Sequence, residues 1–145
     1  MAWRELGQPA LSLSGLQLWV HERPLHGSTG AEEDDWLDVT VQVEAESARV
    51  RTSGSLLTVR ALRAWRDGCA RMLEGQVDSA SLHTVEPELE IEMHETDAAG
   101  HLEMRIEITP DPHHQEHVFL LSLDLSYLPG LIGELDGILG ETSAP

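Results

Sequence analysis

Lysine is absent from this sequence, and basic residues of any kind are scarce. Nine arginines stand against 26 aspartates and glutamates, which gives a formal net charge of −17 at pH 7. A chain this negative repels the phosphate backbone of nucleic acids and the surface of anionic membranes. We therefore expect neither a nucleic acid nor a membrane as a partner.

Signals for export and membrane insertion are also missing. No apolar run approaches the roughly 18–20 residues that a membrane-spanning helix needs. The N-terminus has no basic segment followed by an apolar stretch, as a signal peptide would. Cys69 is the one cysteine, so an internal disulfide is excluded, which fits a reducing compartment. Together these absences predict a cytoplasmic protein.

Catalytic signatures are missing as well. The sequence has no phosphate-cradling glycine loop and no Gly-x-Ser-x-Gly motif. Cys69 lies on the apolar stripe of a predicted helix, where a buried cysteine behaves as an inert small hydrophobe. Carboxylates are so abundant that any two could be paired as an acid and a base, which gives such a pairing little weight. We expect no enzyme activity and no cofactor.

What the chain does contain is a strong pattern of strands. Its length fits a single domain over residues 1–145, with an ordered core from about residue 11 to about residue 140 and short tails. Apolar and polar residues alternate as in half-buried strands. The segments with this alternation are 16–21, 37–44, 48–53, 81–85, 88–95, 101–108 and 117–125.

Two segments have helical periodicity instead. Apolar residues recur at helical spacing in Thr58–Glu74, which Gly75 would end, and in Ser126–Leu139, with Ser126 as a candidate N-cap. Pro129 is tolerated in the second helix because it would lie in the first turn. The fold class is therefore α+β: an antiparallel sheet of about six strands with two amphipathic helices packed on one face. The expected core comprises Leu62, Met72, Ile91, Met104, Ile106, Phe119, Leu121, Leu131 and Leu135.

Acidic residues are concentrated in two places. Five glutamates fall on what reads as the outer face of a hairpin: Glu88, Glu90, Glu92, Glu103 and Glu107. A loop carries four more acidic residues: Glu32, Glu33, Asp34 and Asp35. Like charges facing each other across strands cost about 0.2–1 kcal/mol per pair, so their retention favours a charged recognition surface. The alternative is that they only keep the sheet soluble and discourage edge pairing.

Histidines form one dense cluster, His113, His114 and His117, in the segment "PDPHHQEH". Such spacing binds zinc when a helix or tight turn makes the imidazoles converge. Here two prolines precede the cluster and a strand follows it, so the side chains of adjacent residues tend to diverge. We expect no metal at this loop. His94 and His101 flank a hairpin turn and could face each other across it, but the default expectation is that they are solvated loop histidines.

The order of segments resembles the WapI-like immunity protein family. The likeness spans about Leu16 to Leu139 and rests on the segments "DWLDVTVQV", "SLLTVRALRAWRDGCARMLEG", "TVEPELEIEM" and "ITPDPHHQEHVFLLSLDLSYLPGLIGELDGIL". Better-known members protect bacteria against secreted toxin domains of wall-associated, contact-dependent systems. The resemblance implies a non-enzymatic protein whose partner is a cognate toxin domain. Many such toxins are nucleases with basic substrate clefts.

Three hypotheses follow. The first is an immunity-type inhibitor that binds a toxin through an acidic surface, the second a small metal-binding protein built on the His113–His117 loop, and the third a soluble domain with no toxin partner. Neighbouring genes separate the first from the third, because immunity genes directly follow toxin genes. Metal analysis of the purified protein tests the second.

Overall fold

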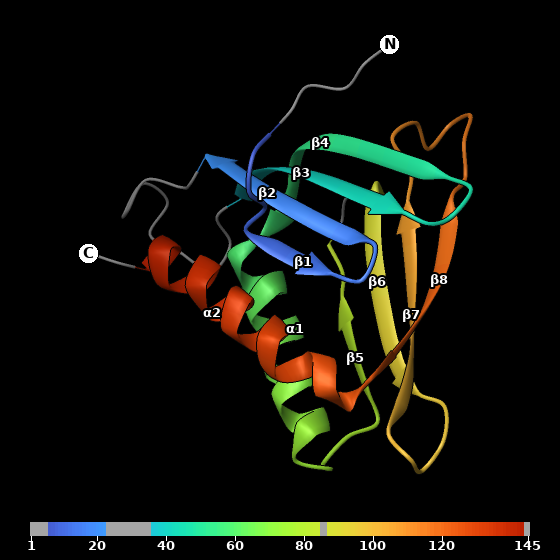
Figure 1. The fold of residues 1–145 in the computed structure, drawn as a ribbon. Coiled ribbons are helices and arrows are strands. Elements are labelled where there is room, and N and C mark those ends of the chain that lie inside the picture. The colour runs from blue at the N-terminus through green and yellow to red at the C-terminus, as the bar shows by residue number, and fades with distance from the viewer. Residues whose placement is uncertain (1–5, 23–35, 85–86, 144–145) are drawn as a thin grey trace.

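The computed structural model describes residues 6–22, 36–84 and 87–143 of the chain. In chain order these form β1 (Leu11–Leu13), β2 (Leu16–Glu22), β3 (Trp36–Glu44), β4 (Arg49–Thr58), α1 (Val59–Leu73), β5 (Ser79–Leu82), β6 (Leu89–Glu95), β7 (His101–Ile108), β8 (Val118–Asp124), a short 3-10 helix, η2 (Leu125–Tyr127), and α2 (Leu128–Ser143) (Figure 1). The same order of elements, four strands and then a long helix, therefore occurs twice.

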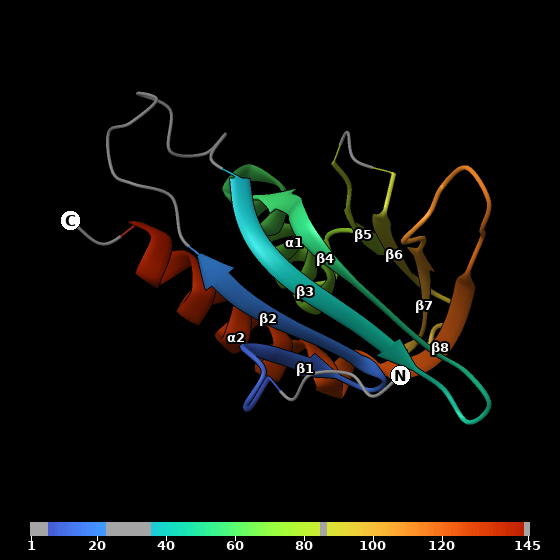
Figure 2. The ribbon, with the colours of Figure 1, turned by 90° about the horizontal axis from the view of Figure 1, so that it is seen from above.

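The strands form two antiparallel sheets of four strands each, not one sheet of six. The first sheet has the order β1-β2-β3-β4 and the second β5-β6-β7-β8. The strands of the first sheet run across the ends of the strands of the second (Figures 1 and 2). The prediction of a single sheet was wrong because hydrophobic alternation marks the face that a strand buries, not its neighbour. Both sheets bury their apolar faces in the same core, so the alternation along the sequence does not reveal where one sheet ends and the other begins.

Two strands of the first sheet differ from the prediction. β1 was not predicted, although Leu11 and Leu13 alternate with a serine; it pairs with β2 through the tight turn at Ser14 and Gly15. β4 extends from the expected short run as far as Thr58 and pairs with the whole of β3. The first sheet is thus larger than the sequence pattern indicated.

Helix α1 has nearly the predicted bounds. Its N-cap is Thr58, whose hydroxyl accepts a hydrogen bond from the backbone N–H of Ala61 at 3.1 Å. Gly75 follows the C-terminus with φ +74°, a left-handed conformation that favours glycine, and the backbone N–H of Gln76 donates to the carbonyl of Arg71. The prediction that the helix ends at Gly75 is confirmed.

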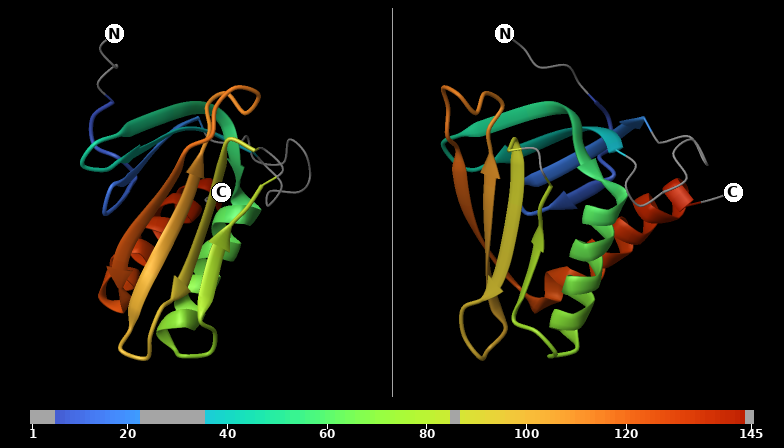
Figure 3. Two further views of the ribbon diagram at one scale, coloured as in Figure 1. Left: turned by 90° about the vertical axis from the view of Figure 1, so that its right-hand side faces the viewer. Right: turned by 180° about the vertical axis from the view of Figure 1, so that it is seen from behind.

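Helix α2 begins two residues later than predicted. Ser126 lies within η2, and the Asp124 side chain caps that short helix by accepting a hydrogen bond from the Ser126 backbone N–H. Pro129 is the second residue of α2 and so lies in its first turn, as expected. Both helices lie on the inner side of the second sheet (Figure 3), where α1 contacts β5 and α2 packs mainly against α1 and β1.

One hydrophobic core joins the two sheets and both helices. The predicted core residues Leu62, Met72, Ile91, Met104, Ile106, Phe119, Leu131 and Leu135 are buried. Leu121, also predicted there, is only partly buried. Trp65 of α1 is 1% exposed and donates its indole N–H to the sulfur of Met93, 3.3 Å away. No helix within the described ranges is long and apolar enough to cross a membrane.

Candidate functional site

The candidate site is the outer face of the second sheet, which no helix or strand of the described residues covers (Figure 3). On β6, Glu90 and Glu92 alternate with Leu89, Ile91 and Met93, and the three apolar residues are buried. Side chains on a strand alternate between its two faces, so the two glutamates point away from the core. The core thus fixes which residues this face presents.

The neighbouring strand β7 extends the same face. Glu103, Arg105 and Glu107 alternate with residues that are buried, among them Leu102 and Met104. Alternate residues on a strand lie about 6.6 Å apart, which is within the Debye length of about 8 Å at physiological ionic strength. The fields of these side chains therefore add.

The strand register places an arginine or a histidine opposite two of these four carboxylates. Glu92 pairs with Arg105, and His94 pairs with Glu103. Glu90 pairs with Glu107, which is the one like-charged pair in this register. Glu107 is in turn bound by Arg105, with 2.7 Å between Nη2 and Oε1. Arg105 thus offsets part of the repulsion predicted from the sequence.

The face nevertheless remains negative. Arg105 is the one arginine among the outward residues of β6 and β7, against the carboxylates of Glu90, Glu92, Glu103 and Glu107. The hydrogen bond to Glu107 raises the pKa of the Arg105 guanidinium, and the charges of Glu92 and Glu90 act in the same direction. Exposed ion pairs of this kind contribute only about 0–1 kcal/mol, so the side chains can exchange these partners for others.

Two apolar side chains lie beside the charged rows. Val118 and Leu120 of the edge strand β8 are 41% and 59% exposed. They pair with Glu107 and Arg105, respectively, in the β7–β8 register. These two side chains thus form an apolar edge to the charged face.

Two predicted parts of the acidic surface stand apart from this face. Glu88 precedes β6 in a turn and is half-buried, and its Oε2 atom is buried without a hydrogen-bond partner among the described residues. Part of the Glu88 carboxylate is thus buried, which departs from the expected solvent exposure of this glutamate. The acidic loop Glu32, Glu33, Asp34 and Asp35 lies outside the described residues.

The comparisons with known proteins identify the family. The model of the immunity protein WapI-like family matches residues 11–142. The chain belongs to this family. No curated protein matches the sequence. Among solved structures, the chain is similar to the crystal structure of WHY3 from Arabidopsis thaliana, with 10% identity and a TM-score of 0.47 over 99% of this chain and 92% of that one. A likeness this weak carries no argument about function.

The histidine-rich loop of this WapI-like immunity protein does not bring its imidazoles together. His114 Nδ1 lies 3.0 Å from a carboxylate oxygen of Asp111, and His117 Nε2 lies 3.1 Å from the side-chain oxygen of Gln115. The ring centroids of His113 and His114 are 6.5 Å apart. His114 and His117 thus have separate local partners, and the loop is not a place where three potential ligands of the described residues converge.

The two histidines at the hairpin turn do not face each other either. His94 lies opposite Glu103, with 3.9 Å between Nε2 and Oε1. His101 Nδ1 lies 2.6 Å from Asp97 Oδ2. The hydrogen bond with Asp97 raises the pKa of His101, and the hydrogen bond with His101 lowers the pKa of Asp97. This exposed pair closes the β6–β7 turn.

Cys69 lies in the core and not in a setting that would activate its thiol. Its side chain is fully buried on α1, and burial raises the pKa of the thiol to about 12. A nucleophilic cysteine needs the opposite shift, because the thiolate is the reactive form. Cys69 therefore acts as a core residue, as the sequence predicted.

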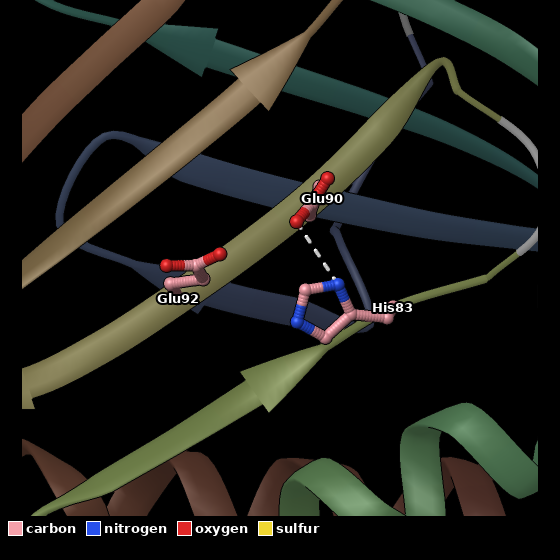
Figure 4. Close-up of side chains that lie close together, drawn as sticks. All are labelled: His83, Glu90 and Glu92. Carbon is pink, nitrogen blue, oxygen red and sulfur yellow. Dashed lines mark ion pairs between the residues drawn. The ribbon is translucent and has the colours of Figure 1, made fainter.

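His83 is the residue of this face that sequence reasoning missed. It follows β5 and lies beside β6, where its Nδ1 atom is 3.0 Å from Glu90 Oε1 (Figure 4). The alternation that placed Glu90 outward also predicts that His83, two residues after Ser81, points outward. The sequence pattern does not reveal that β5 pairs with β6, which places Leu82 opposite Ile91 and so brings His83 beside Glu90.

Proposed function

We propose that this WapI-like immunity protein is a non-enzymatic inhibitor that binds a cognate toxin domain through the outer face of the second sheet. Membership of the family supports an immunity role, and such a role needs binding without chemistry. We choose this surface because no helix or strand of the described residues covers its row of carboxylates on β6 and β7, at Glu90, Glu92, Glu103 and Glu107. Binding there would block the toxin by occlusion.

The charge of the face favours a toxin with a basic cleft. A nuclease has such a cleft because it binds the phosphate backbone of its substrate, and a row of carboxylates offers it similar charges. Complementary charge also raises the association rate, up to about 10⁸–10⁹ M⁻¹s⁻¹ at low salt. The exposed side chains of Leu120 and Val118 would supply apolar contact beside the charged row.

The first test is a pull-down with the product of the gene directly upstream, where a toxin gene is expected. Association kinetics of the two purified proteins would then be measured over a range of salt concentrations. The informative variant is Glu90→Gln with Glu92→Gln, which removes two negative charges. We expect it to fold normally, because it relieves the repulsion between Glu90 and Glu107.

The expected result is that association slows by roughly threefold to tenfold at low salt and depends less on salt. A matched control is Glu44→Gln with Glu46→Gln, which removes the same charge from exposed positions at the β3–β4 turn of the first sheet. Neutralising Glu32–Asp35 tests the other acidic segment as the contact site. An unchanged rate and salt response in the Glu90/Glu92 variant would refute this choice of surface.

A further inference from the structure

Three potential metal ligands converge on the outer face of the second sheet, at its β5 edge. The ligand atoms of His83, Glu90 and Glu92 all lie within 4.8 Å of one another. Figure 4 shows His83, which follows β5, and the two glutamates of β6 meeting above the sheet. Within the described ranges, this is the one group of three or more histidine, cysteine or acidic side chains whose ligand atoms come together.

The backbone holds this arrangement in place. Ser81 pairs with Glu92, and Leu82 pairs with Ile91. The side chains of Leu82 and Ile91 are each 1% exposed, so the core fixes the register of the two strands. Shifting the register by one residue would turn these apolar side chains to solvent. His83 is therefore held beside Glu90, and the site needs little rearrangement of the backbone.

The distances fit a small metal ion. Zinc bonds of about 2.0–2.2 Å place tetrahedral ligand atoms roughly 3.4 Å apart, and His83 Nδ1 already lies 3.0 Å from Glu90 Oε1. Bringing Glu92 to the same spacing needs only rotation of a flexible side chain. The Glu92 side chain is exposed, and its charge interacts with Arg105 without a hydrogen bond or ion pair of 4.0 Å or less to another described side chain. Its rotation therefore breaks no such contact.

The charge and chemistry of the ligands identify the class of ion. A neutral imidazole with two carboxylates balances the charge of a divalent cation. Calcium prefers six to eight oxygen ligands and magnesium an octahedron of oxygens, whereas imidazole suits zinc and its neighbours in the first transition row. One histidine nitrogen with two carboxylates leaves a position open for water, because the site is exposed. We propose that His83, Glu90 and Glu92 bind a divalent transition-metal ion, with zinc as the ion of best fit.

Arg105 opposes cation binding at this site. It pairs with Glu92 across β6 and β7, and its positive charge also acts on Glu90. Replacing Arg105 with glutamine would remove that repulsion while leaving all three ligands in place. The structure therefore predicts that Arg105→Gln strengthens zinc binding, whereas loss of a ligand, as in His83→Ala, weakens it.

The test is calorimetric titration of the purified full chain with zinc chloride. The wild type should bind one zinc ion at this site, and His83→Ala should weaken that binding at least about tenfold, since even indirect metal-site partners account for about 10–100-fold in affinity. Arg105→Gln should bind zinc more tightly than the wild type. His94→Ala is the matched control, because His94 lies on the same face with a similar exposure, 52% against 50% for His83.

The chain has eight histidines, so zinc bound elsewhere must be distinguished. If His83→Ala binds zinc as the wild type does, or if His94→Ala loses the ion instead, the proposal is wrong. Glu92→Gln provides a second variant of nearly unchanged shape and should also weaken binding; unaltered affinity there would equally overturn it. Thermal unfolding followed by circular dichroism verifies that each variant is folded.

This inference does not rest on the proposed toxin binding, although both involve Glu90 and Glu92. Zinc binding is measured on the free protein, so its failure would leave the immunity role untouched. His83→Ala separates the two further, because it removes a metal ligand but no carboxylate from the acidic row.

Discussion

Replacing Trp65 with alanine should destabilise the whole domain more than any exposed substitution. The indole lies where α1 meets both sheets. With Leu11, Leu16, Leu18, Val41 and Leu57 of the first sheet and Leu82, Leu89 and Ile91 of the second, it lines an apolar cavity of about 10 Å³. Removing the ring would enlarge this void at a point where neither sheet can move in without losing its own contacts.

The size of the effect follows from the buried area. A tryptophan side chain buries about 150–250 Å², and at about 25 cal/mol per Å² this corresponds to roughly 4–6 kcal/mol. Measured substitutions of buried phenylalanine or tryptophan by alanine cost about 3–5 kcal/mol. We expect the free energy of unfolding to fall by about 3–5 kcal/mol, out of the roughly 5–15 kcal/mol typical of a domain. Trp65→Phe, which keeps one ring but loses the hydrogen bond to Met93, should cost roughly 1–2 kcal/mol.

Urea unfolding followed by far-ultraviolet circular dichroism measures these differences. Tyr127→Ala is the control for loss of an aromatic ring, because Tyr127 is 43% exposed, and it should change stability by less than about 1 kcal/mol. A loss of under about 1 kcal/mol for Trp65→Ala would refute the argument that this side chain joins the sheets. So would separate unfolding transitions for the two sheets in the wild type.

Two further predictions concern close packing and pH. A Cβ atom at Gly68 would lie 2.9 Å from the Cβ of Ala80, so Gly68→Ala should lower stability by about 1–3 kcal/mol although alanine has the better helix propensity. Adding Ala80→Gly to this variant should restore much of the lost stability. If the urea midpoints show that the two substitutions have additive effects, the contact is contradicted. The Asp97–His101 pair should contribute most between pH 3.8 and 6.5, the ordinary pKa values of the two groups. Because the pKa of Asp97 is lowered in the folded protein, its contribution to stability is lost as the pH falls through that pKa. Because the pKa of His101 is raised, its contribution to stability is lost as the pH rises through that pKa. In an NMR titration, Asp97→Asn should return the pKa of His101 toward 6.5, and an unchanged titration would speak against the pair.

Local features of the fold could be predicted from the sequence because they depend on neighbouring residues. The start of the first helix near Thr58, its end at Gly75 and the alternation around Ile91 are each set within a few positions of the chain. The assignment of strands to two sheets was not predictable in this way, because α1 separates β4 from β5 and both sheets bury their apolar faces in one core. Periodicity carries no information about which strands are hydrogen-bonded.

In the candidate site, too, features that depend on one strand could be predicted, and features that depend on strand pairing could not. Alternation predicted that Glu90 and Glu92 share a face, since this depends on one strand alone. The compensation of Glu92 by Arg105, and the approach of His83 to Glu90, depend on the registers of β6 with β7 and with β5. Those registers are fixed by core packing between residues distant in sequence. Charge counted along the chain therefore overestimated the repulsion on this face.

The repeated order of four strands and a helix does not make the molecule modular. Each repeat supplies one wall of a single core, and Trp65 of the first repeat is packed against residues of the second. A chain cut in the turn between α1 and β5, at Gln76 or Val77, would yield two fragments that each expose an apolar face. Such fragments would be expected to fold only on meeting, so this turn is the natural place to divide the protein into a complementing pair that reports when its two halves are brought together.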